Sequence, residues 1–258
     1  MAAAYFLAGA LGLVVGSFLN VCIWRIPRKQ SIISPSSRCP SCGTPIAPWD
    51  NVPVLSYIAL RGKCRHCGAR ISPRYPFVES LNAALYLLVL YRFGLGWHTA
   101  VYFAFVSALI VVTFIDLDFQ IIPDGITLSG IPLGLLAGAF LVPDPFSRME
   151  GLGLVSSVLG AAVGFSLFYA VAYLSRGGMG GGDIKLMAMV GALTGWKGVL
   201  LTTFLGSLGG SVVGLFLMVF KGKGRKTKVP FGPFLALGAV LTLFLGQEIL
   251  SWYLHVRR

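Results

Sequence analysis

Residues 98–115 read HTAVYFAFVSALIVVTFI, a stretch without one Asp, Glu, Lys or Arg. A run this long and apolar is typical of a helix that crosses a bilayer, because about 20 such residues span the hydrocarbon core. Similar runs recur on both sides of it. We expect about eight spans, at residues 5–24, 77–93, 98–115, 125–142, 151–174, 184–196, 198–220 and 231–254. Residues 195–198, Gly-Trp-Lys-Gly, predict either a tight turn between two helices or a kink within one.

The composition excludes an ordinary soluble globule. Of the 258 residues, 56% are hydrophobic and 12% are charged, and the mean hydropathy is +0.80. Soluble proteins carry about 25% charged residues. The net charge of +12 is interpreted as an excess in cytoplasmic loops, with anionic lipid headgroups as its partner and no nucleic acid. We predict an all-α polytopic membrane protein.

One long polar segment, residues 25–76, separates the first two expected spans. It holds a single acid, Asp50, and nine basic residues: Arg25, Arg28, Lys29, Arg38, Arg61, Lys63, Arg65, Arg70 and Arg74. Cytoplasmic loops are enriched in Lys and Arg, which puts this segment and residues 116–124, 175–183 and 221–230 on the inner side. We therefore expect a first transmembrane helix at residues 1–24, a cytoplasmic domain at 25–76 and a transmembrane domain at 77–258.

The cytoplasmic segment contains two C-x-x-C-G sequences. Their thiols are Cys39 and Cys42 in the first and Cys64 and Cys67 in the second. Two such pairs complete the four-thiolate tetrahedral shell that is typical of structural zinc. Disulfides would be the alternative, which a reducing cytosol disfavours. We predict a zinc site that stabilises this small domain and, being closed, takes no part in catalysis.

Several of the nine acids lie on the predicted inner side, at the ends of apolar runs: Asp116, Asp118, Asp124 and Asp183. Asp at a helix start is a common N-cap, which could explain Asp124 and Asp183. It does not explain Asp116 at a helix C-terminus, where the helix dipole opposes a negative charge. An acid at such a position is a candidate functional residue.

Two aspartates held close together can share one proton and so hydrolyse an amide. One carboxylate takes a proton from the attacking water, while the other carboxyl group protonates the carbonyl oxygen. The glycine-rich sequence at residues 177–182, interrupted only by Met179, would let an extended peptide approach Asp183, because glycine has no side chain.

The chain resembles the type IV prepilin peptidases, or prepilin leader peptidase/N-methyltransferases, of the G-x-G-D membrane aspartyl protease class. The resemblance covers nearly the whole length. Its motifs are Gly16-Ser17-Phe18-Leu19-Asn20-Val21 with Arg25-Ile26-Pro27, the cysteine pairs with Arg61-Gly62-Lys63-Cys64, Arg74-Tyr75-Pro76-Phe77-Val78-Glu79, Asp116-Leu117-Asp118 with Ile122-Pro123-Asp124, Gly180-Gly181-Gly182-Asp183-Ile184-Lys185-Leu186, and Val229-Pro230-Phe231-Gly232-Pro233-Phe234.

The resemblance implies two activities in the bacterial inner membrane. Such enzymes cut the basic leader from prepilins and pseudopilins at the cytoplasmic face, then methylate the new N-terminal residue with S-adenosylmethionine. It implies Asp116 and Asp183 as the catalytic pair. Candidates for a supporting role are Asp124, Asp118, Gly180, Gly182 and Lys185.

The resemblance also implicates Gly62, Lys63 and Glu79 in methyl transfer. No G-x-G-x-x-G follows a predicted strand, so the sequence pattern alone predicts no methyl-donor site. Gly62-Lys63 could equally form a turn, and Glu79 could favour a helix start. Two alternatives stay open: a peptidase without methyl transfer, and a noncatalytic membrane scaffold or channel with a zinc module.

Overall fold

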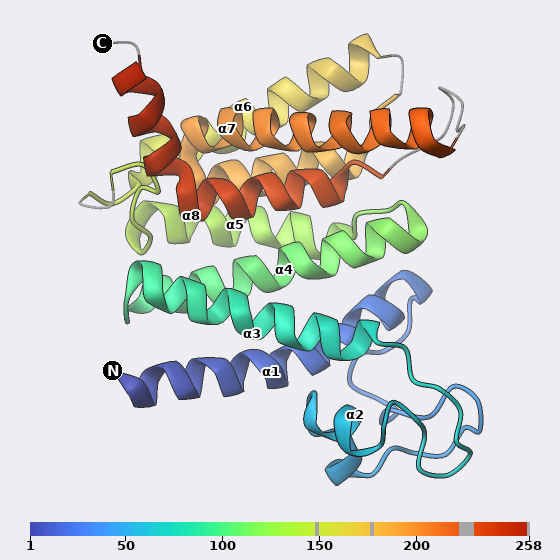
Figure 1. Ribbon diagram of the computed structural model, residues 1–258. Coiled ribbons are helices and arrows are strands. Elements are labelled where there is room, and N and C mark those ends of the chain that lie inside the picture. The colour runs from blue at the N-terminus through green and yellow to red at the C-terminus, as the bar shows by residue number, and fades with distance from the viewer. Residues whose placement is uncertain (148–149, 176–177, 222–229, 257–258) are drawn as a thin grey trace. The chain divides into compact units, whose positions relative to one another are not determined.

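The computed structural model describes residues 1–147, 150–175, 178–221 and 230–256, and every regular element within them is helical (Figure 1). The long helices are α1 (Ala2–Arg25), α3 (Arg74–Phe93), α4 (Trp97–Phe119), α5 (Asp124–Phe140), α6 (Gly153–Leu174), α7 (Gly181–Lys221) and α8 (Gly232–Val256). Between α1 and α3 lie the 3-10 turns η1 (Ile26–Arg28) and η2 (Pro48–Asn51) and the short helix α2 (Leu55–Ala59). The predicted all-α class is confirmed.

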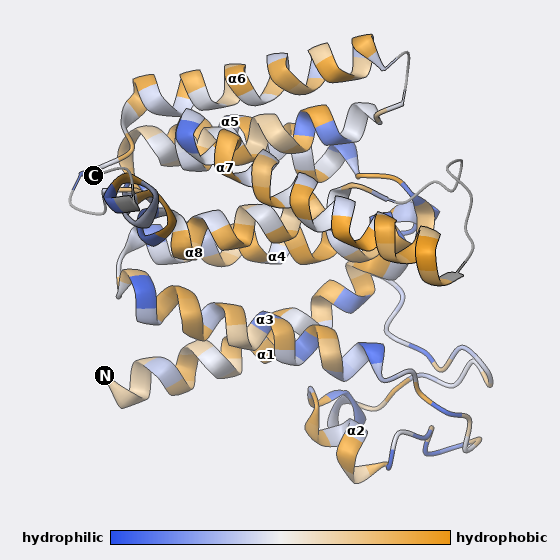
Figure 2. Ribbon diagram, turned by 45° about the horizontal axis from the view of Figure 1, so that its top comes forward, coloured by the Kyte–Doolittle hydropathy of each residue, from blue (hydrophilic) through white to orange (hydrophobic). Residues whose placement is uncertain are grey.

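Five of the described helices are long and apolar enough to cross a membrane: α1 extended by η1, α4, α6, α7 and α8. Helix α5 is apolar but has 17 residues. The 20-residue α3 carries Arg74, Glu79 and Arg92. Hydrophobic colour dominates the long helices in Figure 2, whereas the segment between α1 and α3 is largely hydrophilic. The chain is a multi-pass membrane protein. Arg176, Gly177 and the basic stretch at 222–229 lie outside the described residues.

Helix α7 is interrupted at Gly195, whose φ of 71° and ψ of 178° are not helical. A Cβ on Gly191 would lie 2.8 Å from Cγ2 of Val199. Positions eight residues apart in a continuous helix are separated by about 12 Å along the axis. The chain therefore bends sharply at Gly195, within the stretch where a turn or kink is predicted, and α7 consists of two helical segments.

The chain forms two compact units, residues 1–111 and 112–258. In the first, α1 packs along α3 (Figure 1). A Cβ on Gly12 would lie 2.6 Å from Cα of Ala83, and one on Gly16 would lie 2.6 Å from Cα of Glu79. This small-xxx-small spacing lets two helices approach closely. The fully buried Asn82 fastens the contact, since its side-chain amide donates to the Gly12 carbonyl at 2.8 Å.

In the second unit the first half of α7 packs against α5 and α6, and the second half packs against α8. A Cβ on Gly134 of α5 would lie 3.1 Å from Cβ of Ala192. Between the second half of α7 and α8, the Thr202 hydroxyl donates to Oγ1 of Thr242 at 3.1 Å, and both threonines are buried. These contacts hold the first half of α7 against α5 and its second half against α8.

Candidate functional site

Asp116 lies one turn before the end of α4, in the second unit, and is buried at 5% exposure. The N–H of Gly232, the first residue of α8, donates to its Oδ2 at 3.0 Å. A Cβ on Gly232 would lie 2.7 Å from the same oxygen. Because the first N–H groups of a helix have no partner within the helix, the start of α8 supplies a donor to this carboxylate.

Asp183 is the third residue of α7 and is buried at 9% exposure. Two of the glycines before it are tightly placed. A Cβ on Gly180 would lie 3.3 Å from Oδ2 of Asp183, and one on Gly182 would lie 2.7 Å from Cβ of Ile122. Glycine at position 180 therefore keeps one side of the Asp183 carboxylate free of side-chain atoms, and glycine at 182 allows close packing on Ile122.

The two buried aspartates belong to one cluster. The charge of Asp116 acts on Asp183. Ile122 lies between glycines that adjoin the two aspartates: its Cδ1 is 3.2 Å from the Cβ position of Gly232, and its Cβ is 2.7 Å from the Cβ position of Gly182. The cluster is built from the end of α4, the segment before α5 and the starts of α7 and α8. Helix starts carry partial positive charge, so α7 and α8 offset the unfavourable dipole that Asp116 meets at the end of α4.

The other predicted acids lie apart from this pair. Asp124 is the first residue of α5, its side chain is 60% exposed, and Lys185 Nζ lies 2.7 Å from its Oδ1. Pro123 is the N-cap of α5 and no side chain caps the helix, so the N-cap interpretation of Asp124 is wrong: the carboxylate binds a lysine distant in sequence. The N-cap interpretation of Asp183 is also wrong, because this residue lies inside the first turn of α7. Asp118 is exposed on α4.

The four cysteines of the polar segment come together in the first unit. Their sulfurs all lie within 4.8 Å of one another, and Cys39 Sγ is 3.9 Å from Cys67 Sγ. None of the four forms a disulfide. The two knuckles fold alike: the N–H of Gly43 donates to the Cys39 carbonyl at 2.9 Å, and the N–H of Gly68 donates to the Cys64 carbonyl at 3.0 Å. Both glycines have positive φ, 70° and 69°.

This donor set suits a soft metal ion. Sulfurs at about 2.3 Å from a tetrahedral ion lie about 3.8 Å apart, close to the spacing between Cys39 and Cys67. The side chain and backbone of Thr44 lower the pKa of the Cys42 thiol to about 6. Backbone hydrogen bonds of Cys67 and His66 lower the pKa of Cys64. Both effects favour the thiolate, which is the form that binds metals, whereas burial and hydrogen bonds with the other three cysteines raise the pKa of Cys67 to about 11.

The residues implicated in methyl transfer also lie in the first unit. Gly62 and Lys63 line a hollow of about 530 Å³ together with Tyr57, Arg61, Arg70, Ile71, Ser72 and Pro73. Glu79 is buried in α3, where its Oε2 accepts a hydrogen bond of 2.8 Å from the N–H of Val54. Val54 immediately precedes α2, whose Tyr57 hydroxyl oxygen lies 3.0 Å from the Cβ position of Gly62. Helix α2 thus connects Glu79 to the hollow.

Comparison with known proteins gives this arrangement a family. Two family models match the chain. The model described as "Bacterial Peptidase A24 N-terminal domain" matches residues 10–93, and the model described as "Type IV leader peptidase family" matches residues 103–215. A Pseudomonas putida protein named prepilin leader peptidase/N-methyltransferase is 38% identical over 96% of this chain and 94% of its own. The chain belongs to the type IV leader peptidase family.

Other relatives of this leader peptidase family member carry the same name. A Pseudomonas aeruginosa protein is 36% identical over 95% of this chain and 91% of its own, and a Legionella pneumophila protein is 35% identical over 97% and 94%. No solved structure matches the chain. The family match at 103–215 contains both buried aspartates, and the match at 10–93 contains all four clustered cysteines.

Two residues of the leader peptidase cluster were not predicted to take part in it. Gly232 and Ile122 each belong to a family motif, but neither motif predicts a role for them. The available sign for Gly232 is its position before Pro233 at the start of an apolar run, since proline favours the first turn of a helix and a helix start offers unpaired N–H donors. No sequence pattern indicates that Ile122 contacts Gly182.

Proposed function

We propose that this chain is a prepilin leader peptidase that also N-methylates its product, with Asp116 and Asp183 as its catalytic residues. The observation that carries the peptidase assignment is the pair of buried carboxylates, one accepting the first N–H of α8 and the other inside the first turn of α7. A buried acid in a membrane protein is expensive and is therefore a functional candidate. The family and the names of the relatives support the assignment.

The two carboxyl groups would cleave the peptide bond with water and without a covalent intermediate. One carboxylate removes a proton from water as the water oxygen attacks the scissile carbonyl carbon, and the other carboxyl group donates a proton to the carbonyl oxygen. Collapse of the tetrahedral intermediate breaks the C–N bond. The leaving amine takes the proton that the first carboxylate removed from water, and the second carboxylate takes its proton back as the carbonyl re-forms. Gly232 fixes one oxygen of Asp116, so the other oxygen is available for the water.

We further propose that the aspartates face the cytoplasm of a bacterial inner membrane. The positive-inside rule puts the basic segment 25–76 inside, and the break at Gly195 supports counting the two halves of α7 separately, which gives eight spans with α3 and α5. Asp116 and Asp183 are then on the same side as that segment. The hydrophobic helix of a prepilin or pseudopilin would enter sideways among the spans, with its basic leader in the cytoplasm.

Methyl transfer is assigned to the first unit. S-adenosylmethionine supplies a methyl group bound to a positively charged sulfur. The hollow beside Gly62 and Lys63 has the size of a small-molecule site, and basic groups in its lining could pair with the carboxylate of the methyl donor. Glu79 binds Val54 at the start of α2 and would thereby position Tyr57 of α2, which lines the hollow. Zinc in the four-cysteine cluster would hold the knuckle that follows Lys63.

A direct test is incubation of the purified protein with a prepilin, with and without S-adenosylmethionine, followed by mass measurement of the product N-terminus. We expect a shortened product in both samples, and one added methyl group only with the methyl donor. An uncut prepilin would reject the peptidase proposal. A cut but unmethylated product in both samples would reject only the methyltransferase half.

A further inference from the structure

Helix α2 and turn η2 expose several large apolar side chains of the segment between α1 and α3. Trp49 is 70% exposed, and Leu55 and Ile58 are each 65% exposed. Leu55 and Ile58 are three residues apart on a helix, so they lie on the same face. Figure 2 shows the hydrophobic colour on part of α2. Apolar side chains gathered in this way on a polar segment indicate a binding surface.

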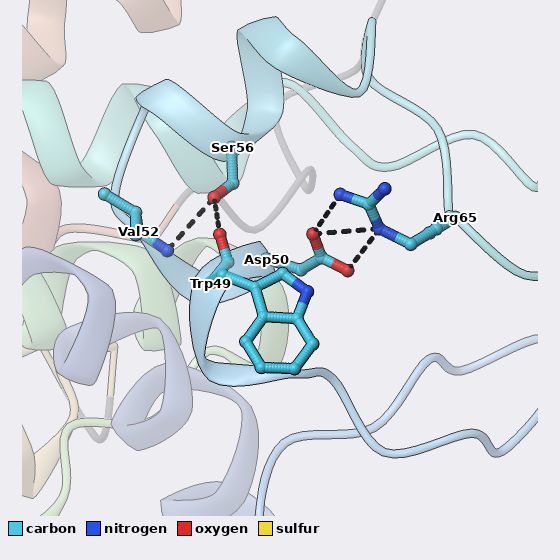
Figure 3. A network of polar contacts seen from close by, with 5 residues as sticks. All are labelled: Trp49, Asp50, Val52, Ser56 and Arg65. Atoms are coloured by element: carbon cyan, nitrogen blue, oxygen red, sulfur yellow. Dashed lines mark hydrogen bonds and ion pairs between the residues drawn. The ribbon is translucent and has the colours of Figure 1, made fainter.

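Ser56 links turn η2 to helix α2 (Figure 3). Its hydroxyl donates to the Trp49 carbonyl at 2.9 Å and accepts from the N–H of Val52 at 3.1 Å. Ser56 itself is buried at the centre of this link. Turn η2, which carries Trp49, is therefore fixed to helix α2, which carries Leu55 and Ile58.

The hydrogen bond between Val54 and Glu79 fixes the position of this surface along the axis of α1. Val54, the residue before α2, donates to Glu79 Oε2 at 2.8 Å, and Cα of Glu79 lies 2.6 Å from the Cβ position of Gly16. Gly16 precedes the end of α1 at Arg25 by nine residues, about 13 Å of helix. The start of α2 is thus one glutamate side chain away from the part of α3 that packs on Gly16, well before the end of α1. Helix α1 is long and apolar enough to cross a membrane.

Aromatic side chains mark the boundary of the membrane near this level. Trp24 lies in the last turn of α1 and is 51% exposed, and Tyr75 and Phe77 are exposed in the first turn of α3. The Asn20 amide donates to the Tyr75 carbonyl at 3.1 Å, which aligns the two helix ends. Trp and Tyr favour the headgroup region of a bilayer. Glu79 lies one turn further along α3 than Tyr75, toward the bilayer interior.

The charge of the segment fits a lipid surface. Its single acid, Asp50, forms an ion pair with Arg65, whose Nε and Nη2 donate to the carboxylate at 2.6–3.1 Å (Figure 3). Hydrogen bonds from Arg65 lower the pKa of Asp50. The remaining basic residues of the segment outnumber its acids, so the segment has a net positive charge. Anionic headgroups attract such a segment.

We propose that η2 and α2 form an interfacial membrane anchor, in which Trp49, Leu55 and Ile58 enter the boundary between headgroups and acyl chains on the side of the membrane where α1 ends. The anchor holds the four-cysteine segment flat against the bilayer and keeps the hollow beside Lys63 at the membrane surface. Its ligand is the lipid bilayer.

The depth of Trp49 tests the anchor directly. The full-length protein with the other four tryptophans replaced, as Trp24→Phe, Trp97→Phe, Trp196→Phe and Trp252→Phe, is reconstituted in phosphatidylcholine/phosphatidylglycerol vesicles. We expect lipid brominated near the top of the acyl chain to quench Trp49 emission by about half or more, and deep-brominated lipid to quench it less, because interfacial residues lie about 5–10 Å below the headgroups. Aqueous acrylamide should quench it weakly.

A matched variant adds Leu55→Ser and Ile58→Ser to this background. We expect weaker quenching by lipid and stronger quenching by acrylamide, with prepilin cleavage retained as evidence of folding. Trp49 emission that is insensitive to both brominated lipids and fully open to acrylamide would overturn the proposal. In that case the surface would be available to a water-soluble partner. Equal quenching of Trp49 with and without Leu55 and Ile58 would also contradict an anchor built on α2.

Discussion

Burying two carboxyl groups in a membrane protein requires nearby compensation, and in this chain helix starts provide it. The N–H of Gly232 binds Asp116, and Asp183 lies in the first turn of α7. Both positions favour negative charge, since the start of a helix carries partial positive charge. The exposed Asp124 instead has Lys185 as its partner. Asp124 also lies at a helix start, so burial, and not position relative to helix ends, distinguishes Asp116 and Asp183 from it.

Replacing Gly232 should damage cleavage without removing a catalytic group. In Gly232→Ala the new Cβ would lie 2.7 Å from Asp116 Oδ2, which displaces either the carboxylate or the start of α8. We expect the cleavage rate to fall between about tenfold and a hundredfold, as misplacement by an ångström does elsewhere. Methylation of a precut pilin should be unchanged. Gly214→Ala, with open space around its Cβ, is the control, and equal rates for the two variants would refute this role of Gly232.

The exposed pair of Asp124 and Lys185 should matter little. Asp124→Asn removes one charge from an ion pair whose side chains are 60% and 32% exposed, and such pairs contribute less than about 1 kcal/mol. We expect near-normal cleavage and a small change in thermal stability, measured by product formation and by melting in detergent. Loss of cleavage comparable to that of Asp116→Asn would move the catalytic role to Asp124.

At the scale of elements, the break in α7 decides how the second unit packs. Gly195 has a φ of 71°, and a Cβ there would lie 3.0 Å from Leu152 Cδ1. Gly195→Ala should cost about 1–3 kcal/mol, because an L side chain is strained at this backbone conformation. Thermal unfolding in detergent measures the loss. Gly125→Ala, at a helical position with no atom near its Cβ, should unfold near the wild-type temperature; equal destabilisation of both would argue against the strain.

Elements set by local sequence were predictable, and contacts between distant segments were not. The long helices follow from apolar runs, and the two knuckles from C-x-x-C-G, because spacing and glycine conformation fix both locally. The hydrogen bond from Gly232 to Asp116 joins residues 116 positions apart, and the partner of Asp124 is 61 positions away. The short α2, with Val54 at a φ of 60°, is held by Glu79 from outside the polar segment, so no local pattern indicates it.

At the scale of the whole molecule, the candidate residues for the two activities fall in different units. The aspartates belong to residues 112–258, whereas the cysteines, Lys63 and Glu79 belong to residues 1–111. This division agrees with two separable chemical steps, and it predicts that damage to one unit leaves the other step working.

Removing the metal should therefore separate the activities. Cys42→Ser leaves three of the four thiolate donors, and a strong chelator competes with all four for the ion, so either treatment should release the zinc, measured by elemental analysis relative to protein. We expect methylation of a precut pilin to be lost while prepilin cleavage continues, because zinc would stabilise only the small segment beside the hollow. Loss of both activities together, with the protein still folded, would contradict the division.

The central claim is that Asp116 and Asp183 hydrolyse the leader. Its most direct test compares purified Asp116→Asn, Asp183→Asn and, as an exposed matched control, Asp124→Asn by the mass of the product N-terminus after incubation with a prepilin. The dyad predicts no shortened product from either of the first two variants, normal cutting by the control, and methylation of a precut pilin by all three. Cleavage at the wild-type rate by Asp116→Asn or Asp183→Asn would contradict the account.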